Sequence, residues 1–414
     1  MGGTVLSGPC IPVTTQTGTD SSSTPFSLAA NPSPIHPDRR NTAPDVLIIA
    51  NESYVEPTAI TQLNAVSKLQ GVLSTIGMPD LHPGTTFPVG ATVITHGSTI
   101  RPALIGGDIG CGMALYVTGV SAQKAKAKPS WIANKIRDIE GAWGGELDCT
   151  VTDWLHDAGV KSVDSTWNSS LGTIGGGNHF AELQVIEKIW DQTAFDEYVT
   201  SVSASSGVHG RPQCSDDEGV EHLTDIEAID PTSHLFLLVH SGSRGLGQNI
   251  LASTKSSLSS AGVHTGAPLV KGTEEFETYL TQHDDACKWA RCNRDLIAHR
   301  ILECIDETYF PHPSSHSSEG ELHSSPVPSM LKRRKVLDIW HNNVEQNHEW
   351  KPSSGSETST NPNSVDIPTC DSVWVHRKGA APSDRGLVVI PGSRGAYSFL
   401  ALPTGPQRRN GESL

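Results

Sequence analysis

The chain has 414 residues and a formal net charge of −15, with 36% hydrophobic residues, 39 glycines and 27 prolines. This length allows one large domain or two to three ordinary ones, and the glycine and proline content indicates that part of the chain is irregular. The negative charge argues against a broad nucleic-acid-binding face, which needs clustered basic residues, but it leaves room for a small local phosphate site. No apolar run reaches the roughly 18 residues of a membrane span, so we expect no membrane partner.

The N-terminal stretch and the cysteines bear on compartment. Residues 1–44 are rich in Ser, Thr, Pro and Gly without the order of a signal peptide, so we expect a disordered tail there. Eight cysteines without a CxxC pair are typical of a reducing compartment. We therefore predict a cytoplasmic or nuclear protein that is not secreted. The basic run at residues 332–335 can be a nuclear signal, but it runs directly into an apolar segment, which favours a solvated turn entering a strand.

Hydrophobic periodicity predicts the elements of the folded part. In chain order we expect a strand at 45–50, a helix over 56–73, glycine and proline punctuation at 77–84, strands at 89–95 and 113–117, a helix over 122–140, strands at 179–187 and 234–240, a helix from 273 to about 309, and strands at 372–375 and 386–390. This order places residues 106–112 in a loop between two strands. Cys287 and Cys292 on the long helix are expected to be packing residues.

Other stretches are not expected to contribute to a core. They are an acidic loop at 212–218 and Ser/Pro-rich inserts at about 312–329 and 353–368. We predict one large α+β domain over residues 45–402, made of mixed β-sheets with flanking helices and with metal-binding loops at strand ends. A short tail follows at 403–414.

The loop at residues 106–112 (GGDIGCG) is the first candidate site. Asp108 offers a hard oxygen and Cys111 a soft sulfur, a combination that fits a borderline divalent ion better than Ca²⁺ or Mg²⁺. Taken alone, the heptapeptide is explained equally well by a tight glycine turn with a buried cysteine.

Further strand ends carry ligand-type residues, most of them beside glycine. Asp108, Cys111, His179, His240 and His341 together would supply the carboxylate, thiolate and imidazoles of a dinuclear centre for Mn²⁺, Zn²⁺ or Co²⁺, with the thiolate as a possible bridge. Glycine-flanked serines and arginines would present donors to phosphates: Ser243, Arg244, Ser393 and Arg394. A metal beside a phosphate cradle suggests phosphoryl or nucleotidyl transfer.

Seven motifs in order resemble those of the RtcB family of RNA ligases, over about residues 45–402 with interruptions by the inserts. They are MPDLH at 78–82, DIGCG at 108–112, GNHF at 177–180, HSGSRG at 240–245, HN at 341–342, HRKGA at 376–380 and PGS at 391–393. The resemblance implies one Mn²⁺ held by Asp108, Cys111 and His179, and a second held by Cys111, His240 and His341. It also implies contacts to a guanine nucleotide from Asn178, Phe180, Ala181, Glu182, Asn342, Pro391, Gly392, Ser393, Arg394 and Ser398. Arg394 stands where the family usually has methionine.

By resemblance, the cofactors are two Mn²⁺ ions and GTP. The expected reaction joins an RNA 3′-phosphate or 2′,3′-cyclic phosphate to a 5′-hydroxyl, as in tRNA splicing or RNA repair, through a guanylylated histidine. The expected motif of that histidine, HGAGR, would lie beyond Leu414, so the chain is predicted to be truncated before it and no catalytic residue is assigned. His376 is the last histidine in the sequence and belongs to a different motif. An activating protein is not identified.

Three functions remain open from the sequence. The first is a Mn²⁺- and GTP-dependent RNA ligase. The second is a catalytically inactive homologue that binds metal and RNA ends. The third is a metallohydrolase, since a dinuclear site with an open position can activate water.

Overall fold

A computed structural model describes residues 11–12, 45–49, 54–137, 139–144, 150–196, 231–264, 266–309, 329–348, 372–392 and 396–403. The predicted tail over residues 1–44 (apart from 11–12), the loop at 212–218, the inserts at 312–328 and 353–368, and residues 404–414 lie outside these ranges. Among the helices of the described ranges, none has the length and apolar character needed to cross a membrane.

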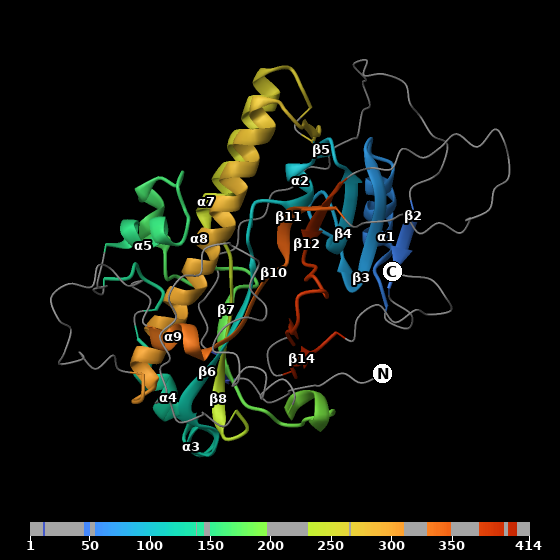
Figure 1. The fold of residues 1–414 in the computed structure, drawn as a ribbon. Coiled ribbons are helices and arrows are strands. Elements are labelled where there is room, and N and C mark those ends of the chain that lie inside the picture. The colour runs from blue at the N-terminus through green and yellow to red at the C-terminus, as the bar shows by residue number, and fades with distance from the viewer. Residues whose placement is uncertain are drawn as a thin grey trace.

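Two five-stranded sheets form the centre of the fold (Figure 1). The first sheet is antiparallel and has the order β1 (Ile11–Pro12), β7 (Phe180–Gln184), β8 (His234–Ser241), β6 (Gly112–Ser121), β10 (Lys335–Trp340). The second has the order β11 (Asn342–Asn347), β12 (Val373–Lys378), β4 (Val89–His96), β3 (Val72–His82), β2 (Asp45–Ile48), with β2 parallel to β3. Two strand pairs complete the set: β13 (Val388–Ile390) with β14 (Phe399–Ala401), and β5 (Thr99–Ile100) with β9 (Leu269–Val270).

A single residue, His341, connects the two sheets at one point. β10 ends at Trp340 in the first sheet and β11 begins at Asn342 in the second. The chain therefore passes from one sheet to the other at His341, which places this side chain at the junction between them.

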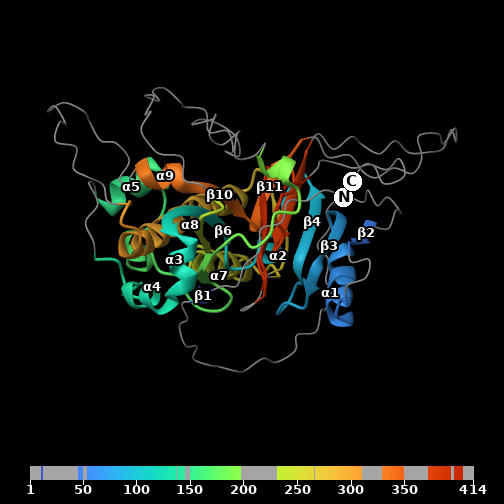
Figure 2. The same ribbon diagram turned by 90° about the horizontal axis from the view of Figure 1, so that it is seen from below.

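The first sheet is covered on both faces. The long helix α8 (Glu274–Ile305) packs on one face, where its fully buried Trp289 joins a core with Tyr116 of β6 and Val239 of β8 (Figures 1 and 2). Leu387, Val389 and Leu400, in and beside the β13–β14 pair, form a smaller cluster with the alternate side chains of the same strands. Because successive residues of a strand point to opposite faces, β6 and β8 have near-continuous apolar runs.

The remaining helices are short apart from α1 and α7. They are α1 (Pro57–Ser67), α2 (Pro102–Ile105), α3 (Ala122–Ala127), α4 (Pro129–Lys135), α5 (Val151–Asp157), the 3-10 helix η1 (Ser165–Ser170), α7 (Gly245–Ser260) and α9 (Ser329–Arg334).

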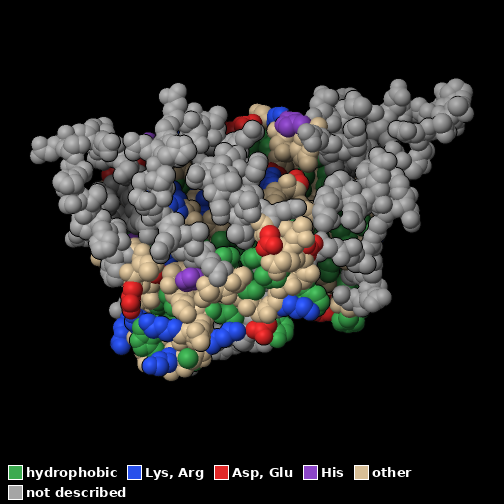
Figure 3. Space-filling model, turned by 60° about the horizontal axis from the view of Figure 1, so that its bottom comes forward, with side chains coloured by type: hydrophobic (Ala, Val, Ile, Leu, Met, Phe, Trp, Pro, Cys, Tyr) green, Lys and Arg blue, Asp and Glu red, His purple; other side chains and the backbone are tan. Residues whose placement is uncertain are grey.

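Surface charge is uneven despite the negative total. Lys124 and Lys135, from α3 and α4, both lie over the ring of Trp131, at 4.3 and 4.0 Å from its centroid. Figure 3 shows Lys and Arg side chains gathered at the lower left of the face that it presents. A negative net charge therefore coexists with a local cationic area.

The α+β fold class is confirmed, and most predicted elements are present. Strands occur where they were expected at β2, β4, β6, β7, β8, β12 and β13, and the long helix occurs as α8. Thr273 begins that helix by accepting a hydrogen bond from the Phe276 N–H. Cys287 and Cys292 are buried free thiols, as packing residues should be.

Two helix predictions were wrong in extent. The helix expected over residues 122–140 is broken into α3 and α4 at Lys128, because a residue before proline is driven out of the helical region and Pro129 begins the next helix. The helix expected over 56–73 ends at Ser67, and Gly71, with a φ of 82°, turns the chain into β3.

Three local predictions were also wrong. The punctuation expected at 77–84 lies mostly within β3, which continues to His82 with an irregular register after Gly77. The loop at 106–112 follows helix α2 rather than a strand. The basic run at 332–335 is largely helix α9 rather than a solvated turn, and the guanidinium of its Arg334 is buried against Asp306, although the run does enter a strand, β10, as expected.

Candidate metal centre

Strand register brings the ligand-bearing segments to one edge of the first sheet. Gly112, the first residue of β6, pairs with both Ser241 at the end of β8 and Trp340 at the end of β10. Phe180, the first residue of β7, pairs with His240. Since neighbouring strands are antiparallel, the start of one meets the end of the next. Cys111, His179 and His341 stand one residue outside β6, β7 and β10, beside His240.

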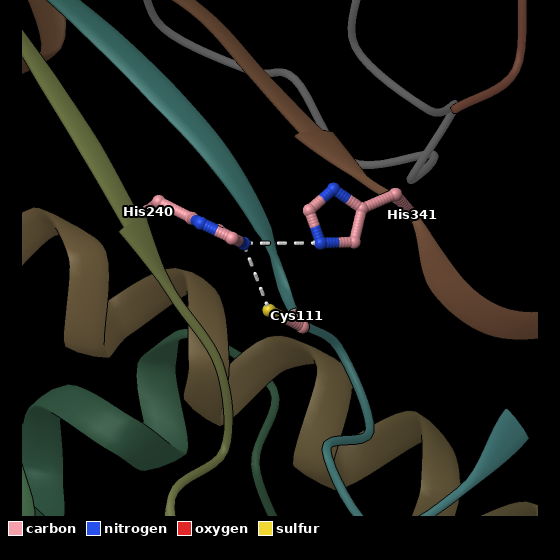
Figure 4. Close-up of side chains that lie close together, drawn as sticks. All are labelled: Cys111, His240 and His341. Atoms are coloured by element: carbon pink, nitrogen blue, oxygen red, sulfur yellow. Dashed lines mark hydrogen bonds between the residues drawn. The ribbon is translucent and has the colours of Figure 1, made fainter. Parts of the chain in front are cut away.

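Five side chains converge at this edge. The Cys111 Sγ lies 3.3 Å from the His179 Nε2 and 3.3 Å from the His240 Nε2. The Nε2 atoms of His240 and His341 are 3.2 Å apart (Figure 4). The His179 Nε2 lies 2.8 Å from a carboxylate oxygen of Asp108. Two groups result, Asp108–Cys111–His179 and Cys111–His240–His341, and within each the ligand atoms lie within 4.8 Å of one another. Cys111 belongs to both groups.

Burial sets the protonation of these side chains. It lowers the pKa of His240 well below its usual value and the pKa of His341 to about 4. Burial, reinforced by the charge of Asp108, raises the pKa of the Cys111 thiol well above its usual range. Burial alone would raise the pKa of Asp108, but the hydrogen bond and charge of His179 lead the effects that lower it. The site thus holds two neutral imidazoles, an anionic carboxylate and a thiol that needs a cation to ionise.

The donor set fits divalent metal ions. Three imidazole Nε2 atoms and one sulfur atom face one another. Whichever of these atoms carry protons, they cannot form hydrogen bonds in every one of the close pairs at once. A cation at the centre of each group would accept a lone pair from every member. Neutral histidine, thiolate and carboxylate are the forms that ligate metals, and mixed oxygen, nitrogen and sulfur sets suit borderline ions.

Glycines let the loops approach closely. A Cβ at Gly242 would collide with the Asp108 carboxylate. Gly110 has a φ of 72°, and a Cβ there would lie 2.8 Å from the Cys287 Cα of helix α8. The ligand loop therefore lies directly on that helix, which only glycine at this position permits.

The expected phosphate donors Ser243 and Arg244 adjoin the same edge. Arg244 precedes helix α7 with a φ of 57°, and its Nε donates to the Thr173 Oγ1 at 3.2 Å. Burial lowers the pKa of Arg244, while the nearby charge of Asp108 opposes that shift. The buried Ser243 Oγ has no hydrogen-bond partner among the described residues. Ser393 and Arg394 lie outside those residues.

Several of the expected nucleotide residues lie in β7 or contact it. The Ser398 Oγ accepts from the Gly392 N–H and from the Gln184 amide, each at 3.1 Å, and the same amide donates to Glu182 at 3.3 Å. The Phe180 ring stands edge-on to the His240 ring, with centroids 5.2 Å apart. A groove near them is lined by Gln184, Ser398 and mostly apolar side chains, among them Leu115, Phe236, Val389 and Phe399.

Other expected residues are placed differently. The Ala181 side chain is buried in the core beneath the sheet, on the face opposite Phe180 and Glu182. The Asn342 amide donates to the Asp108 carbonyl at 3.2 Å and accepts from the Gly379 N–H at 2.7 Å, so it ties two loops together. Asn178 is exposed beside the ligand His179, and Pro391 is half-buried.

His376 has a structural role. It is 1% exposed, and its Nε2 accepts from the Arg101 N–H at 2.9 Å. Burial lowers the pKa of His376 to about 3. The Nε2 lone pair of His376 is therefore occupied by the Arg101 N–H.

Sequence reasoning missed two residues beneath the site, Asn293 and Arg294. They are fully buried at the middle of α8 and bond to the ligand loops. An amide and a guanidinium within the apolar stripe of a long helix would have been the signal, because such groups are rarely buried without a dedicated partner.

The fold and the site define an α+β protein with a candidate dinuclear metal centre at the ends of antiparallel strands. Its sequence matches the family described as "tRNA-splicing ligase RtcB" over residues 62–153 and 146–413. It is 34% identical over 362 residues to "RNA-splicing ligase RtcB2" of Escherichia coli ATCC 25922, covering 87% of this chain and 72% of that protein. It is 24% identical over 412 residues to "tRNA-splicing ligase RtcB" of Archaeoglobus fulgidus, covering 84% and 73%. The chain belongs to the RtcB family.

Proposed function

We propose that this chain is an RNA ligase that joins a 3′-phosphate or 2′,3′-cyclic phosphate end to a 5′-hydroxyl end, with two Mn²⁺ ions and GTP as cofactors. The observation that carries the proposal is the pair of ligand groups sharing Cys111 at one sheet edge. The names of the relatives, RNA-splicing and tRNA-splicing ligases, support RNA as the substrate class.

Each ion has a proposed set of ligands. Asp108, Cys111 and His179 would hold one, and Cys111, His240 and His341 would hold the other, so the Cys111 sulfur would be a ligand of both. When bound, Mn²⁺ would neutralise charge on phosphate oxygens and promote phosphoryl chemistry. The chain itself contributes the buried, glycine-lined edge that admits the ligands and limits water. Arg244, held by Thr173 beside Asp108, would meet a phosphate of the substrate.

The nucleotide site is proposed beside the metals. Phe180, Glu182, Gly392 and Ser398 are proposed to contact the nucleotide, and the Ser398 hydroxyl is already tied to the Gly392 N–H and to the Gln184 amide. Asn178, Asn342, Pro391, Ser393 and Arg394 are proposed to complete the nucleotide contacts, with the backbone rather than the side chain of Ala181. The ligase domain is proposed to span residues 45–402.

RNA is the proposed partner. The free thiols of Cys111, Cys287, Cys292 and Cys304 support a reducing compartment, so we assign the cytoplasm or the nucleus. No observation favours a metallohydrolase over an RNA ligase.

The test supplies the purified chain with Mn²⁺, GTP and two RNAs, one ending in a 3′-phosphate and one beginning with a 5′-hydroxyl. A joined product that is lost in Cys111→Ala and absent with 3′-hydroxyl and 5′-phosphate ends is the expected result. Metal-dependent binding of the 3′-phosphate end without joining would instead identify an inactive, end-binding homologue. Release of phosphate without GTP would identify a hydrolase.

A further inference from the structure

Two adjacent polar residues lie buried at the middle of helix α8. Asn293 and Arg294 are both 0% exposed, although the helix packs against the core of the first sheet. Burying a guanidinium and an amide is costly unless every group finds a partner. Their partners show what the burial achieves.

Arg294 holds three ligand-bearing segments. One terminal nitrogen, NH1, donates to the Gly110 carbonyl at 2.9 Å and to the Ser241 carbonyl at 2.8 Å. These carbonyls belong to the neighbours of Cys111 and His240 in the chain. The Nε and the other terminal nitrogen donate to Asp338 at 3.1 and 2.6 Å. Asp338 lies in β10, the strand that leads to His341.

Asn293 holds the remaining segment and repeats one contact. Its Oδ1 accepts from the Gly172 N–H at 2.7 Å, and its Nδ2 lies 3.3 Å from the Thr173 carbonyl. These residues begin the loop that ends at His179. The same Nδ2 lies 3.1 Å from the Ser241 Oγ and 3.3 Å from the Gly242 carbonyl, and that Oγ donates to the Ile174 carbonyl at 2.8 Å.

The four segments that carry the proposed ligands therefore converge on one turn of one rigid helix. They start from distant parts of the chain, and the Gly110 and Ser241 carbonyls both accept hydrogen bonds from the same Arg294 nitrogen. A lysine could not replace Arg294, because a single ammonium lacks the planar fork that serves Asp338 and two carbonyls together.

We propose that Asn293 and Arg294 are positioning residues of the dinuclear centre, which set the spacing of its ligands without touching the ions. The inference rests on the proposed metal centre. Partners of metal ligands in other proteins change metal affinity by roughly 10- to 100-fold when they are replaced.

The experiment loads the full chain with Co²⁺, whose absorption bands report ligand geometry and thiolate bonding. Arg294→Lys is compared with the wild type and with Arg334→Lys. Arg334 is a matched control, because it is also a buried arginine paired with an aspartate, but its guanidinium bonds to Asp306 and Thr308, which lie outside the ligand loops. Melting temperature without metal measures the structural cost in both variants.

Arg294→Lys is expected to bind Co²⁺ roughly 10- to 100-fold more weakly and with altered thiolate bands. Arg334→Lys is expected to have a lower melting temperature but the same Co²⁺ affinity and Co²⁺ spectrum as the wild type. Asn293→Ser removes the donors to Ser241 and Gly242 but leaves the Arg294–Asp338 ion pair intact. It is the test variant if Arg294→Lys does not fold. Wild-type affinity and spectrum in the folded variant, despite a lower melting temperature, would overturn the inference.

Failure of the proposed ligase function and failure of the positioning role give different results. A wild type that binds two Co²⁺ ions but joins no RNA refutes the ligase and leaves the positioning role measurable. A wild type that binds no Co²⁺ overturns the metal centre and this inference together.

Discussion

Removing the shared sulfur should have a different effect from removing any other ligand. The Cys111 Sγ lies 3.3 Å from both His179 and His240 and belongs to both ligand groups. Cys111→Ala leaves two ligands in each group. His179→Ala or His341→Ala leaves two ligands in one group and all three in the other.

The expected stoichiometry follows from this count. Loss of a direct ligand should weaken a site by more than the roughly 10- to 100-fold seen for indirect partners, or by at least about 2.7 kcal/mol. At Mn²⁺ concentrations that fill the wild type with two ions, we expect one ion in His179→Ala and in His341→Ala, and none in Cys111→Ala. Equilibrium dialysis with metal analysis measures these numbers, and far-UV circular dichroism verifies the fold of each variant. One tightly bound ion in Cys111→Ala, or none in His341→Ala, would refute a bridging role for Cys111.

Three further predictions concern stability. The pKa of His376 is about 3 in the folded chain and about 6.5 when unfolded, so the unfolded state takes up a proton first and stability falls as the pH drops from 6.5. Between pH 6.5 and 5 the free energy of unfolding should fall by about 1.6 kcal/mol more in the wild type than in His376→Gln, and equal pH slopes in urea melts would contradict this. Gly112→Ala places a Cβ 2.9 Å from the Trp340 Cα and should lower the free energy of unfolding by about 2 kcal/mol or more. Gly144→Ala, with open space around the new Cβ, should leave it nearly unchanged. Equal denaturation midpoints for the two variants would contradict this expectation. Mn²⁺ at 100 times its dissociation constant should add about 2.7 kcal/mol per site to wild-type stability, reversibly with a chelator, and the same gain in Cys111→Ala would count against the site.

Local patterns predicted the strands well because burial on both faces leaves a continuous apolar run, as in β8 from His234 to Ser241. They failed where two short elements share one pattern. The residues of α3 and α4 have helical periodicity throughout, and only the effect of Pro129 on Lys128 separates them.

The candidate ligands could be named from the sequence because Cys111, His179, His240 and His341 stand at strand ends, and Asp108 lies in the same glycine-rich loop as Cys111. Their pairing into two groups followed from family resemblance and not from spacing. The supports beneath them could not be foreseen, since Arg294 is 184 residues from the carbonyl it bonds at Gly110. Only the packing of α8 against the sheet edge brings these groups together.

A crystal structure of the Mn²⁺-soaked chain, with anomalous data at the manganese edge, would locate the ions directly. We expect two anomalous peaks, both within bonding distance of the Cys111 Sγ, one beside Asp108 and His179 and the other beside His240 and His341. A single peak away from Cys111, or no peak at this sheet edge, would contradict this expectation.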